Sequence, residues 1–195
     1  MTVAVMKTKA EQSFAEGFDA VKVSLPGAAP VREARVAAAQ RFEELGLPHR
    51  RIEEWKYTDL KSAMKDALPV RSGETVDLTI ADVIVAIGPL AHIDAHRVVF
   101  VNGSYRPELS SAEALAGLEI ESLASVLEAA DSSAAALIGF GGQNSDAVLA
   151  LNTAYMSDGA VIRIHAEAEV GKPLLLVNVR AGDAPCFAAV RNVVE

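Results

Sequence analysis

Four histidines and one cysteine are the side chains of this sequence best suited to bind a metal ion or attack a substrate. His92 and His96 stand four residues apart, the spacing of two ligands on one face of a helix. Gly88-Pro89 comes just before the pair and disfavours a helix there, and His49 and His165 lie far away in the sequence. A zinc or iron site usually needs three or four protein ligands. We therefore expect histidines at the surface or at strand edges, and no metal site.

Cys186 is the single cysteine, and one cysteine with histidines elsewhere is the minimum set for cysteine catalysis. Its neighbours favour a different role. Pro185 precedes it and Phe187 follows it, with two alanines next, so a strand is predicted to begin here. We expect the thiol to be a small buried apolar group in that strand, and not a ligand or a nucleophile.

Two glycine-containing stretches and one pair of glutamates have the residue types of catalytic motifs without their spacing. The stretch GFGG at 139–142 and the dipeptide Gly171-Lys172 resemble phosphate-binding loops only in composition. Pro173 stands where such a loop has Ser or Thr, and no glycine lies five residues before the dipeptide. Glu53 and Glu54 are adjacent, so they point to different faces and cannot easily share a proton. We predict no catalytic residue and no bound nucleotide.

An aromatic and basic stretch holds the only tryptophan. Trp55 and Tyr57, together with Arg50, Arg51 and Lys56, could stack nucleic-acid bases, or the indole could be buried among ion pairs. The formal net charge of −8 argues against a nucleic-acid partner. We therefore favour packing, and predict that Trp55 is mostly buried and joins a helical region to a β-rich region.

Apolar spacing predicts helices in residues 1–75, which we take as an N-terminal helical region. Phe14 and Phe18 share one face of a helix over about residues 7–20. A second helix is predicted from Pro30, a residue suited to a first turn, to Gly46, which ends it. A short helix is expected over about residues 60–67.

Residues 76–156 form a mixed α/β segment in this interpretation. Strands are predicted at 83–87 and 98–101, because both runs are apolar and rich in β-branched residues. Asn102-Gly103 tolerates the positive φ angles of a tight turn, so residues 98–106 are predicted to form a hairpin. Helices are expected over 120–130 and 145–156.

Residues 157–195 are predicted to contain three strands, at 160–165, 173–179 and 187–194. Short strands with brief turns suit a sandwich, a meander or the first coil of a β-solenoid, and periodicity does not choose among them. An apolar last strand would leave an open edge. We therefore expect a fragment of a longer chain, which could self-associate through that edge.

Several segments together are similar to a known family. The segment PHRRIEEWKYTDL contains the signature residues Glu53, Trp55, Lys56, Tyr57 and Thr58. Further similar segments are VVFVNGSYRPELS, which contains Asn102 and Gly103, then LNTAYMSDGAVIRI, and then KPLLLVNV. In this order they resemble the SufB/SufD family of iron-sulfur cluster assembly scaffolds, and the Trp-Lys-Tyr-Thr element favours SufD over its paralogue SufB.

The resemblance implies an α+β chain, with an N-terminal helical region followed by the start of a right-handed parallel β-helix. It also implies SufB and the ATPase SufC as partners. The segments that bind SufC and build the cluster would lie beyond Glu195. No cofactor is therefore expected on this chain, and the iron-sulfur cluster and ATP would belong to the whole complex.

Other functions remain open at this stage. The alternatives to a non-catalytic scaffold subunit are a generic β-solenoid protein-binding module and a hydrolase with an unrecognised active site. The Gly-x-Ser-x-Gly pattern of many hydrolases does not occur. A single cysteine, an N-terminus without the layout of a secretory signal, and apolar runs far shorter than the ~20 residues of a membrane span predict a cytoplasmic protein without a membrane anchor.

Overall fold

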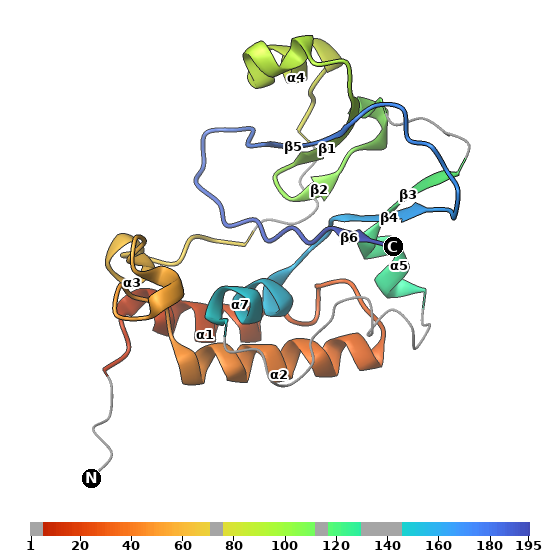
Figure 1. Cartoon of the computed structure of the whole chain (residues 1–195). Coiled ribbons are helices and arrows are strands. Elements are labelled where there is room, and N and C mark those ends of the chain that lie inside the picture. Colours follow the sequence, from red (N-terminus) through yellow and green to blue (C-terminus); the bar gives the residue numbers. More distant parts are fainter. Residues whose placement is uncertain (1–5, 71–75, 112–116, 130–145) are drawn as a thin grey trace.

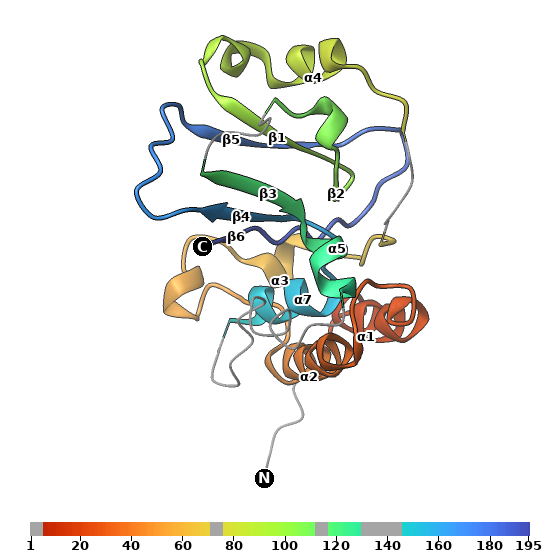
Figure 2. The same cartoon turned by 90° about the vertical axis from the view of Figure 1, so that its right-hand side faces the viewer.

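A computed structural model of the chain describes residues 6–70, 76–111, 117–129 and 146–195. Its elements are stacked in layers (Figures 1 and 2). A helical layer forms the base, two small sheets lie above it, and α4 (Ile80–Ile87) lies on the far side of the upper sheet.

The base is built from α1 (Lys9–Val21), α2 (Ala29–Leu45) and α7 (Ala147–Tyr155). Thr8 and Glu11 form a capping box at the start of α1, and Asp146 caps α7 by accepting two backbone N–H bonds. α2 packs against both other helices. Their apolar faces share one core whose aromatic members meet edge to face: Phe14, Phe18, Phe42, Tyr155 and Phe187.

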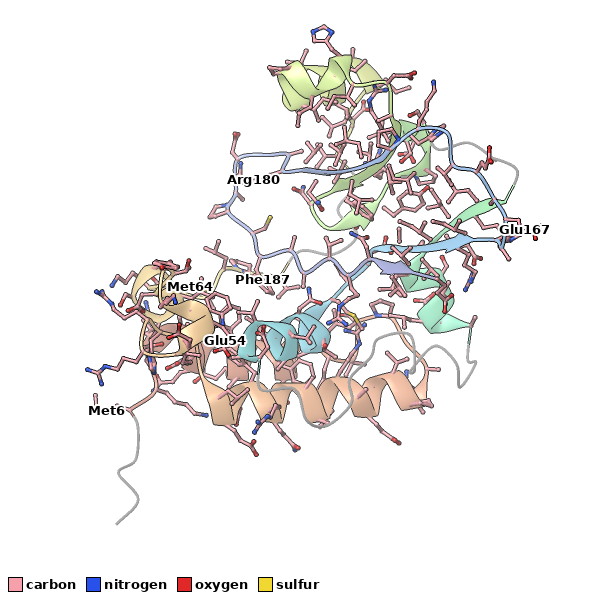
Figure 3. All side chains as sticks on the ribbon, in the orientation of Figure 1. Met6, Glu54, Met64, Glu167, Arg180 and Phe187 are labelled. Carbon is pink, nitrogen blue, oxygen red and sulfur yellow. The ribbon has the colours of Figure 1, made fainter. Side chains whose placement is uncertain are left out.

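Phe187 in this core comes from the C-terminal coil, which runs above α7 (Figure 3). The helices predicted over residues 7–20, 30–46 and 145–156 are α1, α2 and α7. Their observed ends lie within a few residues of the predicted ones. The core, however, combines residues from both ends of the chain. The boundaries at 75 and 156 stay predictions.

Two three-stranded sheets form the middle layers. The first has the order β2 (Ser104–Tyr105), β1 (His96–Val101), β5 (Leu174–Val179), and the second has β3 (Leu118–Ser122), β4 (Ala160–Ile164), β6 (Val193–Val194). In each sheet the central strand has one antiparallel and one parallel neighbour. The remaining short helices are η1 (Glu53–Trp55), α3 (Leu60–Ala63), α4 (Ile80–Ile87), η2 (Gly88–His92), η3 (Pro107–Leu109) and α5 (Leu123–Glu128).

β1 is buried on both faces because it lies between two separate cores. Val99 and Val101 pack in the core under α4, while Val98 and Phe100 face the core shared with the second sheet. This explains why residues 98–101 are a continuous apolar run instead of an alternating one.

The predicted β-helix is wrong. A parallel β-helix stacks coils whose strands all pair in parallel, but β1 with β2 and β3 with β4 are antiparallel. The described residues form two small mixed sheets with helices and no solenoid. The predicted strand at 187–194 is also mostly coil, with only β6 and two isolated bridges, Val70 with Phe187 and Asp158 with Val190. Short apolar strands look alike in both architectures, so the local pattern could not separate them.

The predicted strand at 83–87 is also wrong, because these residues belong to α4. Thr79 and Asp82 form a capping box that starts the helix. A short apolar run by itself does not distinguish a strand from a buried helix. Here the capping box at its start favours the helix.

The hairpin turn lies at Asn102 and Gly103. Their φ angles are 49° and 89°, and Val101 pairs with Ser104 across the turn. Two positive φ angles in succession are typical of the tight turns that match the twist of a hairpin. Beyond the turn, the hydroxyl oxygens of Ser110 and Ser111 accept hydrogen bonds from the N–H groups of Val99 and Arg97. These two serines thus accept hydrogen bonds from N–H groups of β1 that the short strand β2 does not reach.

Candidate docking surface

The signature segment, defined here as residues 48–62, leaves the end of α2 and returns to the helical layer through α3 (Figure 1). It consists of successive tight turns. The N–H groups of Ile52, Trp55 and Thr58 each donate to a carbonyl three residues earlier, at 2.9–3.0 Å. The Lys61 N–H donates to the Pro48 carbonyl at 3.0 Å and closes the segment into a loop with close ends.

A buried carboxylate anchors this loop. Oε1 of Glu11 accepts hydrogen bonds from the Leu47 N–H at 2.7 Å and from the Lys61 ammonium at 3.0 Å. Oε2 accepts the Thr8 N–H at 2.6 Å. The same carboxylate therefore starts α1 and holds Leu47, just before the signature segment, and Lys61, near its end, against that helix.

The surroundings of Glu11 keep its side chain charged. Burial alone would raise the pKa of the Glu11 carboxyl, but hydrogen bonds from the N–H groups of Thr8 and Leu47, with the Lys61 ammonium, outweigh it. The pKa of Glu11 therefore lies below its ordinary value, and the anchor is ionised at neutral pH.

The tip of the loop presents an aromatic ring to solvent. The Tyr57 side chain is 92% exposed. The Lys56 ammonium lies 5.4 Å from the centroid of the Tyr57 ring and 2.5 Å from Oε1 of Glu53. A cation over an exposed aromatic ring contributes about 0.5–1 kcal/mol of stabilisation. The contact with Lys56 therefore favours one orientation of the Tyr57 ring but leaves the ring exposed.

Trp55 does not have the role that was predicted for it. Its side chain is only partly buried, and no residue of η1 is buried. The apolar contacts that join this region to the helical core come from Leu60 and Met64 instead (Figure 3 labels Met64). Trp55 is thus of intermediate burial, and it belongs to none of the hydrophobic cores formed by the described residues.

A hollow lined by basic groups lies beside the tip. Its lining residues are His49, Arg50, Arg51, Asp59, Lys61 and Ser62. Asp59 caps α3 through the Ser62 N–H at 2.9 Å and pairs with Nε of Arg50 at 3.2 Å. The backbone hydrogen bond from Ser62, followed by the contacts with Arg50, lowers the pKa of the Asp59 carboxyl. Basic groups with a ring beside them suit an acidic protein surface better than a reaction centre.

Comparison with known proteins decides the family. The family model described as "SufBD protein N-terminal region" matches residues 8–176. The chain belongs to the SufBD family. It is also 35% identical over 144 residues to an iron-sulfur cluster assembly SufBD family protein of Synechocystis, an alignment that covers 73% of this chain. The matched part is 31% of the length of that relative.

The histidines of this SufBD chain are scattered. His92 lies in η2, His96 starts β1, and Nε2 of His165 lies 3.1 Å from Oε1 of Glu119. Among the residues that the structure describes, no three His, Cys, Asp or Glu side chains lie close enough together to hold a metal ion. Within the same ranges, no helix is long and apolar enough to cross a membrane.

Cys186 differs from its prediction. It lies in coil and is only partly buried, on the wall of an open hollow that includes Asn102, Gly103 and Asn178. The GFGG stretch at 139–142 lies outside the described residues. The Lys172 ammonium lies 2.6 Å from Oδ1 of Asp94, so this lysine forms an ion pair.

Two charged residues that organise the SufBD fold were missed in the sequence. Arg35 is 1% exposed, and its guanidinium donates to the carbonyls of Pro26, Thr153 and Ala154. Burial lowers the pKa of Arg35 to about 10, so it stays charged at neutral pH. The feature of the sequence that indicates a buried Arg35 is its position within the apolar stripe of a helix. The sign of Glu11 is the Thr-x-x-Glu spacing of a capping box.

Proposed function

We propose that this chain is the N-terminal part of a SufD-type subunit, a non-catalytic scaffold in an assembly with SufB and SufC. Its SufBD family membership and the similar cyanobacterial iron-sulfur assembly protein support a role in cluster assembly. In this proposal the cluster and ATP are handled by the whole complex in the cytoplasm, and neither binds to this chain alone.

The observation that carries the proposal is the combination of a rigid loop and an exposed ring. The signature segment is held by the Glu11 carboxylate and by its own turns, yet Tyr57 is left in solvent. Tyrosine and arginine are the residues that most often carry binding energy at protein interfaces. A pre-organised loop also loses little entropy when a partner binds it.

The charge of the segment favours a particular kind of partner surface. Residues 48–62 carry four basic side chains and three acidic ones, within a chain of formal net charge −8. The segment therefore has a formal charge of +1 on an acidic protein, and Arg50, Arg51 and Lys61 line the hollow described above. It suits an acidic patch on a partner, which would guide association and set its orientation.

Co-purification tests the proposal. The tagged chain is co-expressed with SufB and SufC, and we expect it to retain at least one of them through affinity and size-exclusion steps. Tyr57→Ala should weaken that retention, while Val23→Ala, at a side chain that is 84% exposed at the end of α1, should not. A chain that retains neither partner, or a Tyr57→Ala variant that retains them as well as Val23→Ala does, contradicts the proposal.

The other functions considered have no comparable support. The β-solenoid module loses its basis because the described residues contain no solenoid. No group of residues in the described ranges specifically favours a hydrolase.

A further inference from the structure

A second hollow lies between the end of α1 and the start of α2, at the opposite end of these helices from the signature segment. Its volume is about 360 Å³, and it is lined by Phe18, Lys22, Val23, Arg32, Arg35 and Val36. The lining combines apolar side chains with three cations, and none of these six residues carries a carboxylate. Binding sites for small molecules are typically of this kind, with volumes of roughly 300–1,000 Å³, mostly apolar walls and a few polar groups that orient the ligand.

Arg35 is a buried cation in the wall of this hollow. Its terminal nitrogens donate to the carbonyls of Pro26, Thr153 and Ala154, but its Nε has no acceptor among the described residues. No carboxylate in the described ranges contributes to its pKa, which burial alone lowers. A buried charge is normally paired with an opposite charge, because neutral carbonyls replace only part of its hydration. The protein therefore holds a guanidinium here without its counter-ion.

The other two cations are closer to solvent. The Lys22 ammonium lies 2.5 Å from Oδ1 of Asp19, so its charge is already paired. Nη1 of Arg32 donates to the Gly27 carbonyl at 3.0 Å, and no ion pair with Arg32 occurs within the part of the chain that the structure describes. Arg32 and Arg35 stand three residues apart on α2, which places them on the same side of the helix. The two arginines leave the hollow positively charged.

The apolar walls lie beside these arginines. Phe18 supplies a buried ring, and the side chains of Val23 and Val36 are 84% and 42% exposed. A purely ionic ligand would leave these walls in water, and a purely apolar ligand would cover the arginines without pairing them. A ligand that satisfies both parts of the hollow has an anionic head and an apolar body.

We propose that this hollow binds a small carboxylic acid with an apolar chain. The carboxylate would lie against the guanidinium groups of Arg32 and Arg35, whose planar arrays of N–H donors match its two oxygens. The chain would lie against Val23 and Val36. The volume is at the low end of the range for such sites, which favours the small head group of a carboxylic acid. The inference does not depend on the proposed role with SufB and SufC.

Octanoate is the probe that tests this proposal. It is titrated into the whole chain at pH 7, and isothermal titration calorimetry measures binding. Octylammonium has the same chain with the opposite charge, and acetate has the same head group without the chain. We expect octanoate to bind saturably at one site, and each control to bind at least about tenfold more weakly. Equal binding of octanoate and octylammonium, or no saturable binding of octanoate up to about 5 mM, overturns the proposal.

Matched variants on α2 locate the binding. Val36→Asp adds a negative charge to the wall and should weaken octanoate at least about tenfold, while Ala37→Asp, at the next exposed position and outside the lining, should change it by less than about twofold. Arg32→Gln should weaken octanoate at least about threefold, and Arg41→Gln, an arginine outside the lining, should not. Equal effects within either pair overturn the proposal. Circular dichroism confirms that each variant is folded.

The Nε–H resonance of Arg35 reports on the contact without any change to that residue. In ¹H–¹⁵N spectra of the whole chain, saturating octanoate should shift this resonance, and the same concentration of octylammonium should leave it in place. Octanoate that binds while the Arg35 resonance stays unshifted would place the site elsewhere and overturn the proposal.

Discussion

The Lys61 ammonium lies 3.0 Å from Oε1 of Glu11, across fifty residues of sequence. The contact joins the start of α1 to the end of the signature segment. The same oxygen accepts the Leu47 N–H, so one buried carboxylate controls where the loop begins and where it ends. The presentation of Tyr57 therefore depends on a residue that is far from it in sequence.

Glu11→Gln should destabilise the fold, and the effect should depend on pH. The variant loses charge-assisted hydrogen bonds, which corresponds to about 2 kcal/mol at pH 7. Because the folded pKa of Glu11 lies below its ordinary value of 4.5, its contribution is complete above that value and disappears as the pH falls through the folded pKa. Urea unfolding at pH 7 and pH 3 should show the difference between wild type and variant shrinking at pH 3. A difference that is equal or larger at pH 3 would refute the role of this carboxylate.

Gly159→Ala should be among the most damaging small substitutions in the chain. An added Cβ at Gly159 would lie 1.6 Å from the backbone carbonyl oxygen of Arg191, next to the bridge between Asp158 and Val190. Backbone cannot move aside as a flexible side chain can, so we expect a loss of about 3 kcal/mol or more. Gly171→Ala is the control, because nothing lies within 4 Å of its added Cβ. Similar melting temperatures for the two variants would contradict this packing.

Arg35→Ala should destabilise the helical layer. The change leaves the carbonyls of Pro26, Thr153 and Ala154 without their donor and opens a cavity between α2 and α7, at a cost of about 3–5 kcal/mol. Arg41→Ala on the same helix removes only an exposed pair with Glu44 and should cost less than about 1 kcal/mol. Chemical denaturation of both variants checks the contrast, and equal losses would show that Arg35 is not a structural anchor.

Trp55→Ala should have a modest effect on stability. A fully buried indole would correspond to about 3–5 kcal/mol, but this ring is only partly buried, so about 1–2 kcal/mol is expected. Phe42→Ala, in the aromatic core, should show the larger loss. The order of the two denaturation midpoints is the readout, and a Trp55→Ala variant as unstable as Phe42→Ala would restore the original prediction.

Local patterns predicted the elements better than they predicted the arrangement. The spacing of Phe14 and Phe18 and the position of Pro30 placed α1 and α2 closely, because the signals for a helix lie within the helix. The pairing of β1 with β5 joins His96 to Leu174, and no local signal carries such a distant contact. This is why β4 and β5 could be predicted as strands while the sheets that contain them could not.

The role of the signature residues as a site stays a prediction. The signature residues stood out by composition, whereas the contact between Lys56 and the exposed Tyr57 ring was not predicted. The anchoring of this segment by Glu11 was missed, because Glu11 lies in a different helix and only its Thr-x-x-Glu spacing marks it in the sequence. Buried charges that serve distant backbone groups are recognised only when the fold brings the groups together.

Hydrogen exchange on the assembled complex tests the docking role of the signature segment most directly. The chain is measured alone and then with excess SufB and SufC, and peptides covering residues 48–62 are compared with peptides from α1. We predict that exchange in residues 48–62 slows by about tenfold or more in the complex, while residues 9–21 change little. A complex that forms with no added protection in residues 48–62 would contradict the account.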